Sequence, residues 1–252
     1  QGLIPVEKET ASGDEIKITI QGLLGGHSGE EIHRQRGNAN KMMARLLYHI
    51  AEEKSYRLSE IYGGSKDNVI AMEAHASLVA APEDTEQILA MIRNMEDVWN
   101  AEFMGEEPGL TVKTETEKNA DTVVFSKDTT QKVVGYLKAS PNGLKEYSRK
   151  VAGATETSLN LGILELKEDA LTSLTSIRSS VKTRKEDLCA RVTMLVEMLG
   201  GEAEVEGDYP AWEYRTDSAL RPQVEKVYEE LFHKKPVFST IHAGLELSLI
   251  HI

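Results

Sequence analysis

The chain has 252 residues, 40% hydrophobic and 28% charged, which is typical of a globular protein with a substantial core. Its formal net charge of −12 argues against a nucleic acid or an anionic membrane as partner, because phosphate groups need a basic surface. A single cysteine excludes a disulfide framework and a Cys-rich zinc site. We find no apolar run long enough to span a bilayer and no signal-peptide pattern, so we expect a cytoplasmic protein.

The first part of the chain predicts a strand, a helix, two strands and a second helix. Residues 15–20 alternate isoleucine with polar residues, as in a half-buried strand. A glycine-rich turn over 22–29 precedes a helix whose apolar residues share one face. Pro82 and the acidic residues after it open the second helix, because acidic side chains suit a helix N-terminus, and we expect its buried stripe to be Ile88, Ile92, Met95 and Trp99. The remaining elements are expected at residues 39–50 (helix), 56–61 and 70–78 (strands), with Pro108-Gly109 ending the second helix.

The same order of elements is predicted a second time. The expected positions are 110–117 (strand), 129–137 (helix), 155–164 and 169–180 (strands), 184–199 (helix, burying Leu188, Val192, Leu195 and Leu199) and a last strand around Ala203 and Val205. The pattern β-α-β-β-α-β therefore occurs twice, which predicts a two-layer α+β fold with halves at about 1–108 and 109–213. A third piece holds a helix around 224–232, a strand-like run at 237–241 and then His242.

Several segments could carry chemistry, and each also has a plain structural explanation. His27, between glycines, could donate a hydrogen bond from an exposed loop, or it could be an ordinary turn histidine. Asn68, after Gly63-Gly64, could hold a substrate carbonyl or simply cap a turn. Arg178 could bind a carboxylate through its guanidinium fork or form a surface salt bridge. His242 could be a metal ligand, although one histidine is not a metal site.

Taken together and in this order, these segments resemble the M20 metallopeptidases, and most closely the bacterial aminoacyl-histidine dipeptidases of that family. The resemblance covers nearly the whole chain. The segments that carry it include Gly22-Leu-Leu-Gly-Gly-His-Ser-Gly29, Arg36-Gly-Asn-Ala-Asn-Lys41, Gly63-Gly64 with Asn68, Ser140-Pro-Asn-Gly143, Glu156-Thr-Ser-Leu-Asn-Leu-Gly162, Ile177-Arg-Ser179, Tyr209-Pro-Ala-Trp212 and Ile241-His-Ala-Gly-Leu-Glu246.

The resemblance implies a zinc-peptidase catalytic domain of α/β type that is interrupted by a lid domain made of two similar halves. Residues 1–213 then correspond to the lid, which covers the substrate and often mediates dimerisation. Residues 214–246 correspond to the return into the catalytic domain. We interpret residues 247–252 as the translated end of a sequencing adapter, so that His251 has no function, and we expect the chain to be a fragment that lacks the N-terminal catalytic part.

The resemblance also implies a mechanism and a role for each candidate residue. Two divalent metal ions, usually zinc, activate a water molecule, and His242 is the one metal ligand that this chain supplies. His27 corresponds to the residue that stabilises the tetrahedral oxyanion. Asn68 and Asn160 correspond to partners of the substrate backbone, and Arg178 to the clamp on its C-terminal carboxylate. Met72 stands where such dipeptidases often have an arginine, which leaves fine specificity open.

The expected function is hydrolysis of Xaa-His dipeptides by the complete protein, with the fragment itself inactive. One alternative is another M20 hydrolase, such as a tripeptidase or an acyl-amino-acid amidohydrolase. Another is a non-catalytic α+β module that binds peptides or forms a homodimer. The expected partners are a small dipeptide and, in a homodimer, a second copy of the chain, with no nucleic acid and no membrane.

Overall fold

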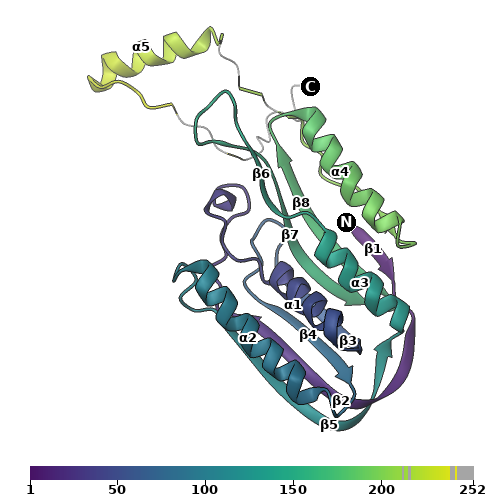
Figure 1. The fold of residues 1–252 in the computed structure, drawn as a ribbon. Helices are drawn as coiled ribbons and strands as arrows, with labels where there is room; N and C mark the ends of the chain where they lie inside the picture. Colours follow the sequence, from purple (N-terminus) through teal and green to yellow (C-terminus); the bar gives the residue numbers. More distant parts are fainter. Residues whose placement is uncertain (212, 215–216, 239–241, 243–252) are drawn as a thin grey trace.

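The computed structural model describes residues 1–211, 213–214, 217–238 and 242 (Figure 1). Its strands are β1 (Gly2–Pro5), β2 (Lys8–Gln21), β3 (Tyr56–Gly63), β4 (Ala74–Ala80), β5 (Thr111–Phe125), β6 (Gly143–Tyr147), β7 (Thr155–Lys167), β8 (Ala170–Ser179) and β9 (Glu202–Ala203). Its helices are the short 3-10 turn η1 (Ile32–Arg34) and α1 (Ala39–Glu53), α2 (Thr85–Phe103), α3 (Lys127–Ala139), α4 (Lys182–Glu197) and α5 (Leu220–Phe232).

The nine described strands form one antiparallel sheet, which consists of two four-stranded units and the additional strand β6. The strand order is β5-β2-β4-β3-β7-β8-β1-β9, and β6 pairs with β7 outside this path. The elements β2-α1-β3-β4-α2-β5 build the first unit, in the ferredoxin-like β-α-β-β-α-β arrangement. The second unit repeats this order with β1-α3-β7-β8-α4-β9. The predicted α+β class with a doubled pattern is therefore confirmed.

The strand pairing corrects the expected boundary of the two halves at residue 108. β5 pairs with β2 from Lys8↔Phe125 to Gln21↔Thr111, so β5 closes the first unit and does not open the second. β1 pairs with β8 and β9, in the second unit. The first unit is thus inserted between the first strand and the first helix of the second. Alternation of side chains reveals a strand but not its partner, which explains the error.

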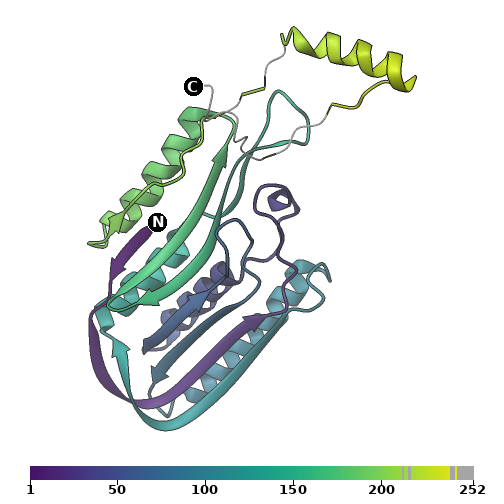
Figure 2. The ribbon, with the colours of Figure 1, turned by 180° about the vertical axis from the view of Figure 1, so that it is seen from behind.

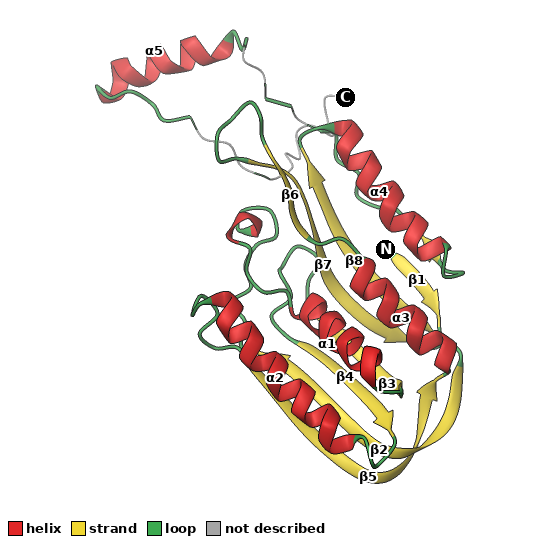
Figure 3. Cartoon of the chain, in the orientation of Figure 1, coloured by secondary structure: helices red, strands yellow, loops and turns green. Residues whose placement is uncertain are grey.

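Helices α1, α2 and α3 cover one face of the sheet, as Figure 3 shows, and Figure 2 shows the strands from the opposite side. The isoleucines of β2 point into this layer and are 0–1% exposed, and the predicted stripe of α2 is buried as expected. The predicted stripe of α4 is only partly confirmed. Leu188 is buried, but Val192, Leu195 and Leu199 are half-buried, because α4 packs on the sheet margin formed by β1, β8 and the two-residue strand β9.

Other expected elements shift at their ends. β4 begins at Ala74 instead of residue 70, because Ile70 donates its backbone N–H to Gly26 in a loop. β6 was not predicted. Val237 and Phe238 are not in a strand, and residues 239–241 lie outside the described part of the chain. Within that part, no helix has the length and apolar character needed to cross a membrane.

Lys41 of α1 holds the two units together on the helical side. Its Nζ donates to the carbonyl oxygens of Leu137, Lys138 (3.2 Å) and Ser140 (2.6 Å) at the end of α3. Burial, together with the charges of Lys138 and Lys145, lowers the pKa of Lys41 to about 8. The ammonium group therefore binds helix carbonyls but is less favoured in the folded protein than in the unfolded chain.

The depressed pKa of Lys41 predicts a pH-dependent contribution to stability. Between pH 8 and the ordinary lysine value, the unfolded chain binds more protons than the folded protein, so the contribution becomes more favourable as the pH rises. The free energy of unfolding of the wild type, minus that of Lys41→Met, should increase by about 1 kcal/mol per pH unit across this window in urea titrations. Lys118→Met, in an exposed strand, controls for loss of a lysine. A difference that stays constant with pH would contradict the prediction.

Candidate functional site

The candidate site lies where the two units of the sheet meet. β3 of the first unit pairs with β7 of the second at Gly63↔Leu164, and we call this meeting of the two units the joint. The segment 64–73 then leaves β3 and crosses the end of the joint. Gly64 has φ +71°, and a Cβ there would lie 1.7 Å from the carbonyl oxygen of Gly162. A Cβ on Gly162 would lie 2.6 Å from the carbonyl oxygen of Asp67. Glycine at both positions therefore permits the loop to lie directly on β7.

The side chains of Asn160 and Asn38 hold the loop of residues 64–73 in place. Asn160 is 1% exposed, and its Nδ2 donates to the carbonyl oxygens of Asp67 (3.0 Å) and Val69 (2.8 Å). Asn38, which caps α1 by accepting from the N–H of Lys41, donates to Asn160 Oδ1 at 3.1 Å. Both amide hydrogens of Asn160 are thus used within the chain. Asn160 therefore holds the backbone on both sides of Asn68, a supporting role that was not foreseen from the sequence, and its contact with a substrate stays a prediction.

The glycine-rich loop after β2 pairs with the Asn68 loop. His27 forms an isolated antiparallel bridge with Val69, and the carbonyl oxygen of Asn68 accepts from the N–H of Ser28 at 2.9 Å. His27 Nδ1 accepts from the backbone N–H groups of Gly29 (3.1 Å) and Glu30 (3.2 Å). An Nδ1 that accepts carries no hydrogen, so in the neutral ring the hydrogen resides on Nε2. The loop therefore presents His27 as a hydrogen-bond donor through Nε2.

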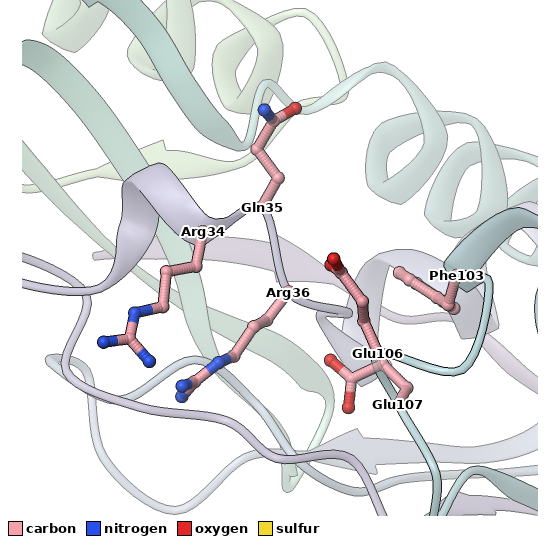
Figure 4. Close-up of a pocket in the computed structure, with 6 residues that line it drawn as sticks. All are labelled: Arg34, Gln35, Arg36, Phe103, Glu106 and Glu107. Carbon is pink, nitrogen blue, oxygen red and sulfur yellow. The ribbon is translucent and has the colours of Figure 1, made fainter. Parts of the chain in front are cut away.

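Two acidic residues that the sequence analysis did not single out hold this loop. Glu107 is 3% exposed and accepts from the N–H groups of Leu24 (2.8 Å) and Gly37 (2.9 Å). Glu31 accepts from the N–H of His27 at 3.1 Å and pairs with Arg36 at 3.0 Å. Figure 4 shows a pocket beside this region, in which Arg34 and Arg36 extend in one direction and Gln35 in the other.

Arg178 and His242 lie near each other, beside the start of β7 and the end of β8. The pairing of these strands sets Arg178 opposite Ser158, whose Oγ is 2.9 Å from His242 Nε2. Arg178 Nε is buried and has no hydrogen-bond partner within the described residues. Burial, with the nearby charge of Arg178, lowers the pKa of His242 to about 4. The histidine is therefore neutral at physiological pH, the form in which imidazole binds metals.

The fold brings the predicted residues together from distant parts of the chain. A Cβ on Gly29 would lie 2.4 Å from the carbonyl oxygen of His242, so the His27 loop lies against His242 itself. His27 and Asn68 thus lie on one side of the joint, and Arg178 and His242 on the other. The rest of the 241–246 segment, and residues 247–252, lie outside the described part of the chain.

No group of three or more His, Cys, Asp or Glu residues that could hold a metal ion occurs among the residues that the structure describes. His242 is accompanied by Ser158 and Arg178, and neither is a usual metal ligand. The metal-ligating role of His242 stays a prediction. Met72, where the resemblance led us to expect an arginine, is 43% exposed and lies against Gly25.

Comparison with known proteins agrees with this architecture. Residues 18–106, which run from β2 to just beyond α2, match the peptidase dimerisation domain of the M20 family. Residues 18–106 thus correspond to an M20 peptidase dimerisation domain, which agrees with the resemblance seen in the sequence motifs.

The particular relatives are dipeptidases. The cytosol non-specific dipeptidase of Escherichia coli (strain K12) is 33% identical over 245 residues, which cover 96% of this chain and 50% of that protein. The crystal structure of aminoacylhistidine dipeptidase from Vibrio alginolyticus matches 98% of this chain and 51% of that chain, with 32% identity and a TM-score of 0.90. The chain therefore spans about half the length of these relatives.

The contact between Gly64 and β7 is testable by a pair of matched substitutions. Gly64 and Gly105 both have positive φ, but only Gly64 faces backbone within 4 Å. Gly64→Ala should lower the free energy of unfolding by about 3 kcal/mol or more, because strain and a backbone clash add. Gly105→Ala should cost only about 1 kcal/mol, from the backbone conformation alone. Equal losses in denaturant titrations would show that the loop does not depend on this close approach.

Proposed function

We propose that the complete protein is a metal-dependent dipeptidase of the M20 type that hydrolyses Xaa-His dipeptides. In this proposal residues 1–213 form the lid that covers the substrate, and residues 214–246 begin the return into the catalytic domain. The observation that carries the proposal is Arg178 Nε, which is buried and has no hydrogen-bond partner among the described residues. The charge of Arg178 lies near His242, whose carbonyl oxygen lies against Gly29 of the His27 loop. The printed activities of the two relatives support the same class of substrate.

Arg178 is suited to the free carboxylate of a dipeptide. A buried N–H without a partner costs about 1–3 kcal/mol, and a ligand that supplies an acceptor recovers this free energy. A guanidinium group also binds a carboxylate through two parallel hydrogen bonds. A site that places this group a short distance from the reacting bond favours short peptides, because the chain must end there.

His27 is suited to the scissile carbonyl. Its Nδ1 is occupied by two backbone N–H groups, so Nε2 is the donor that a substrate oxygen would meet. Such a donor stabilises the negative charge that develops on the carbonyl oxygen when water attacks. Asn68 lies in the neighbouring loop, where Asn160 binds the carbonyl groups on both sides of it and Ser28 binds its own carbonyl oxygen. In the proposal, its side-chain amide binds the peptide backbone.

The described residues do not by themselves fit a two-metal centre, because they hold no group of three or more His, Cys, Asp or Glu residues that could bind a metal, and His242 is accompanied by Ser158 and Arg178. We assign His242 as one ligand and place the remaining ligands, and the general base, in the half of the relatives' length that this chain does not span. Zinc is the metal that we propose. This chain alone should therefore bind and orient a dipeptide but not hydrolyse it.

We propose a cytoplasmic location, which the name of the Escherichia coli relative supports. We also propose that the protein forms a homodimer, which the matched dimerisation domain supports. The free edge of the long strand β5, at the margin of the sheet, offers backbone groups to a second copy. A tripeptidase or an amidohydrolase acting on acylated amino acids remains the alternative activity, and a substrate panel on the complete protein distinguishes these.

Arg178→Met in the complete protein should raise KM for dipeptides about 10-fold or more, because the carboxylate loses a charge-assisted hydrogen bond. The same dipeptides amidated at the C-terminus should be poor substrates of the wild type and should lose nothing further in the variant. Steady-state kinetics with both substrates measures this coupling.

Arg191→Met, an exposed arginine of α4 paired with Asp187, is the control and should change neither substrate. If Arg178→Met weakened free and amidated dipeptides equally, Arg178 would not bind the carboxylate.

A further inference from the structure

Glu31 and Arg36 form an ion pair that is built around the backbone of the His27 loop. One carboxylate oxygen of Glu31 accepts from the backbone N–H of His27 at 3.1 Å, and the other is 3.0 Å from Arg36 Nη2. Arg36 Nη1 donates to the carbonyl oxygen of Gly25 at 2.6 Å. The N–H of Glu31 in turn donates to the carbonyl oxygen of His27 at 2.9 Å. The pair therefore binds the backbone of both Gly25 and His27.

The packing of this pair on the loop leaves no room for a side chain. A Cβ on Gly26, which has φ +125°, would lie 2.3 Å from the Glu31 carboxylate and 2.7 Å from Arg36 Nη1. The Arg36 side chain is 17% exposed, so the pair is partly shielded from water. A shielded pair with several backbone hydrogen bonds contributes more than an exposed surface salt bridge.

The charge state of Glu31 is set by the same contacts. The hydrogen bond from His27 lowers the pKa of the Glu31 carboxyl, and Arg36 and Arg34 lower it further. Glu31 is thus a carboxylate at neutral pH, which is the form that accepts from an N–H and pairs with a guanidinium.

The turn that this pair holds also determines which nitrogen of His27 carries the hydrogen. Gly29 and Glu30 belong to the same turn, and their N–H groups reach Nδ1 only while the backbone from His27 to Glu31 keeps its closed form. In free histidine the two neutral tautomers compete, whereas here two donors favour a ring with hydrogen on Nε2.

We propose that Glu31 and Arg36 are positioning residues that hold the His27 turn closed and thereby keep the ring in the tautomer that donates through Nε2. The meaning of this for catalysis rests on the proposed function, but the tautomer itself does not. The structural basis is the convergence of the carboxylate, the guanidinium and the backbone of Gly25, Gly26 and His27.

The test is ¹⁵N NMR of the imidazole nitrogens in this chain, at a mildly alkaline pH where a free imidazole is neutral. In the wild type, the His27 ring should show a bare Nδ1 and a protonated Nε2. Glu31→Ala should shift both resonances toward the averaged values of a free histidine, because the turn opens. Glu31→Gln keeps an acceptor for the His27 N–H and should restore most of the wild-type signature.

Glu30→Ala is the matched control, because the exposed neighbouring glutamate contributes only its backbone N–H to His27. It should leave the ring unchanged. If Glu31→Ala fails to fold, Arg36→Met, which keeps the Glu31–His27 hydrogen bond but removes the contact to Gly25, should give a smaller shift in the same direction. A wild-type ring with hydrogen on Nδ1, or wild-type signals in both Glu31→Ala and Arg36→Met, would overturn the proposal.

His27→Ala in the complete protein tests the proposed function separately. Turnover should fall about 100-fold or more if Nε2 binds the oxyanion. Unchanged turnover together with the expected NMR shifts would reject the role of His27 and leave the positioning by Glu31 and Arg36 intact.

Discussion

The close approach of one loop to one strand is the constraint on which the candidate site depends. Gly64 and Gly162 bring the backbone of residues 64–69 onto β7 at distances that a Cβ would not permit. Asn160 then binds two carbonyl oxygens of the loop. Because His27 forms a bridge with Val69, the position of the glycine-rich loop follows from that of the Asn68 loop. A shift of this loop would therefore move Asn68 and His27 together.

The inserted topology explains why the site lies between the units and belongs to neither alone. The first unit supplies His27 and Asn68 from the loops after β2 and β3, whereas the second supplies Ser158 and Arg178 from neighbouring strands. β1 belongs to the second unit although it opens the chain, so the first unit is connected at both its ends to its neighbour. Lys41 and the asparagines of α1 then join the units on the helical side. Such a joint holds groups from both units in register.

The sequence predicted much of the local structure because it is encoded locally. Alternation located β2 and β7, and helical spacing located α1 and α2 with their buried faces. The partners of β1 and β5 were not predictable in this way, because pairing depends on the order of strands in the sheet. α4 was predicted with too wide a buried face, since periodicity cannot show how much sheet lies beneath a helix.

The candidate site was predicted through its side chains but not through its supports. His27, Asn68, Arg178 and His242 stood out by type and motif, and they lie around one joint. Glu31, Arg36 and Glu107 escaped notice because they bind backbone groups, which leave no mark on composition. The four-residue spacing between His27 and Glu31 was the available signal. Asn160 was assigned to the substrate, whereas its hydrogen bonds go to the loop.

We propose that the joint between the two units binds a dipeptide at two groups: its C-terminal carboxylate and the carbonyl oxygen of the bond that is cleaved. A crystal structure of the complete protein with a non-hydrolysable dipeptide analogue tests it most directly. The account predicts the analogue's C-terminal carboxylate within hydrogen-bonding distance of Arg178 Nε and its carbonyl oxygen facing His27 Nε2. An analogue bound elsewhere, with Arg178 Nε still lacking an acceptor, would contradict it.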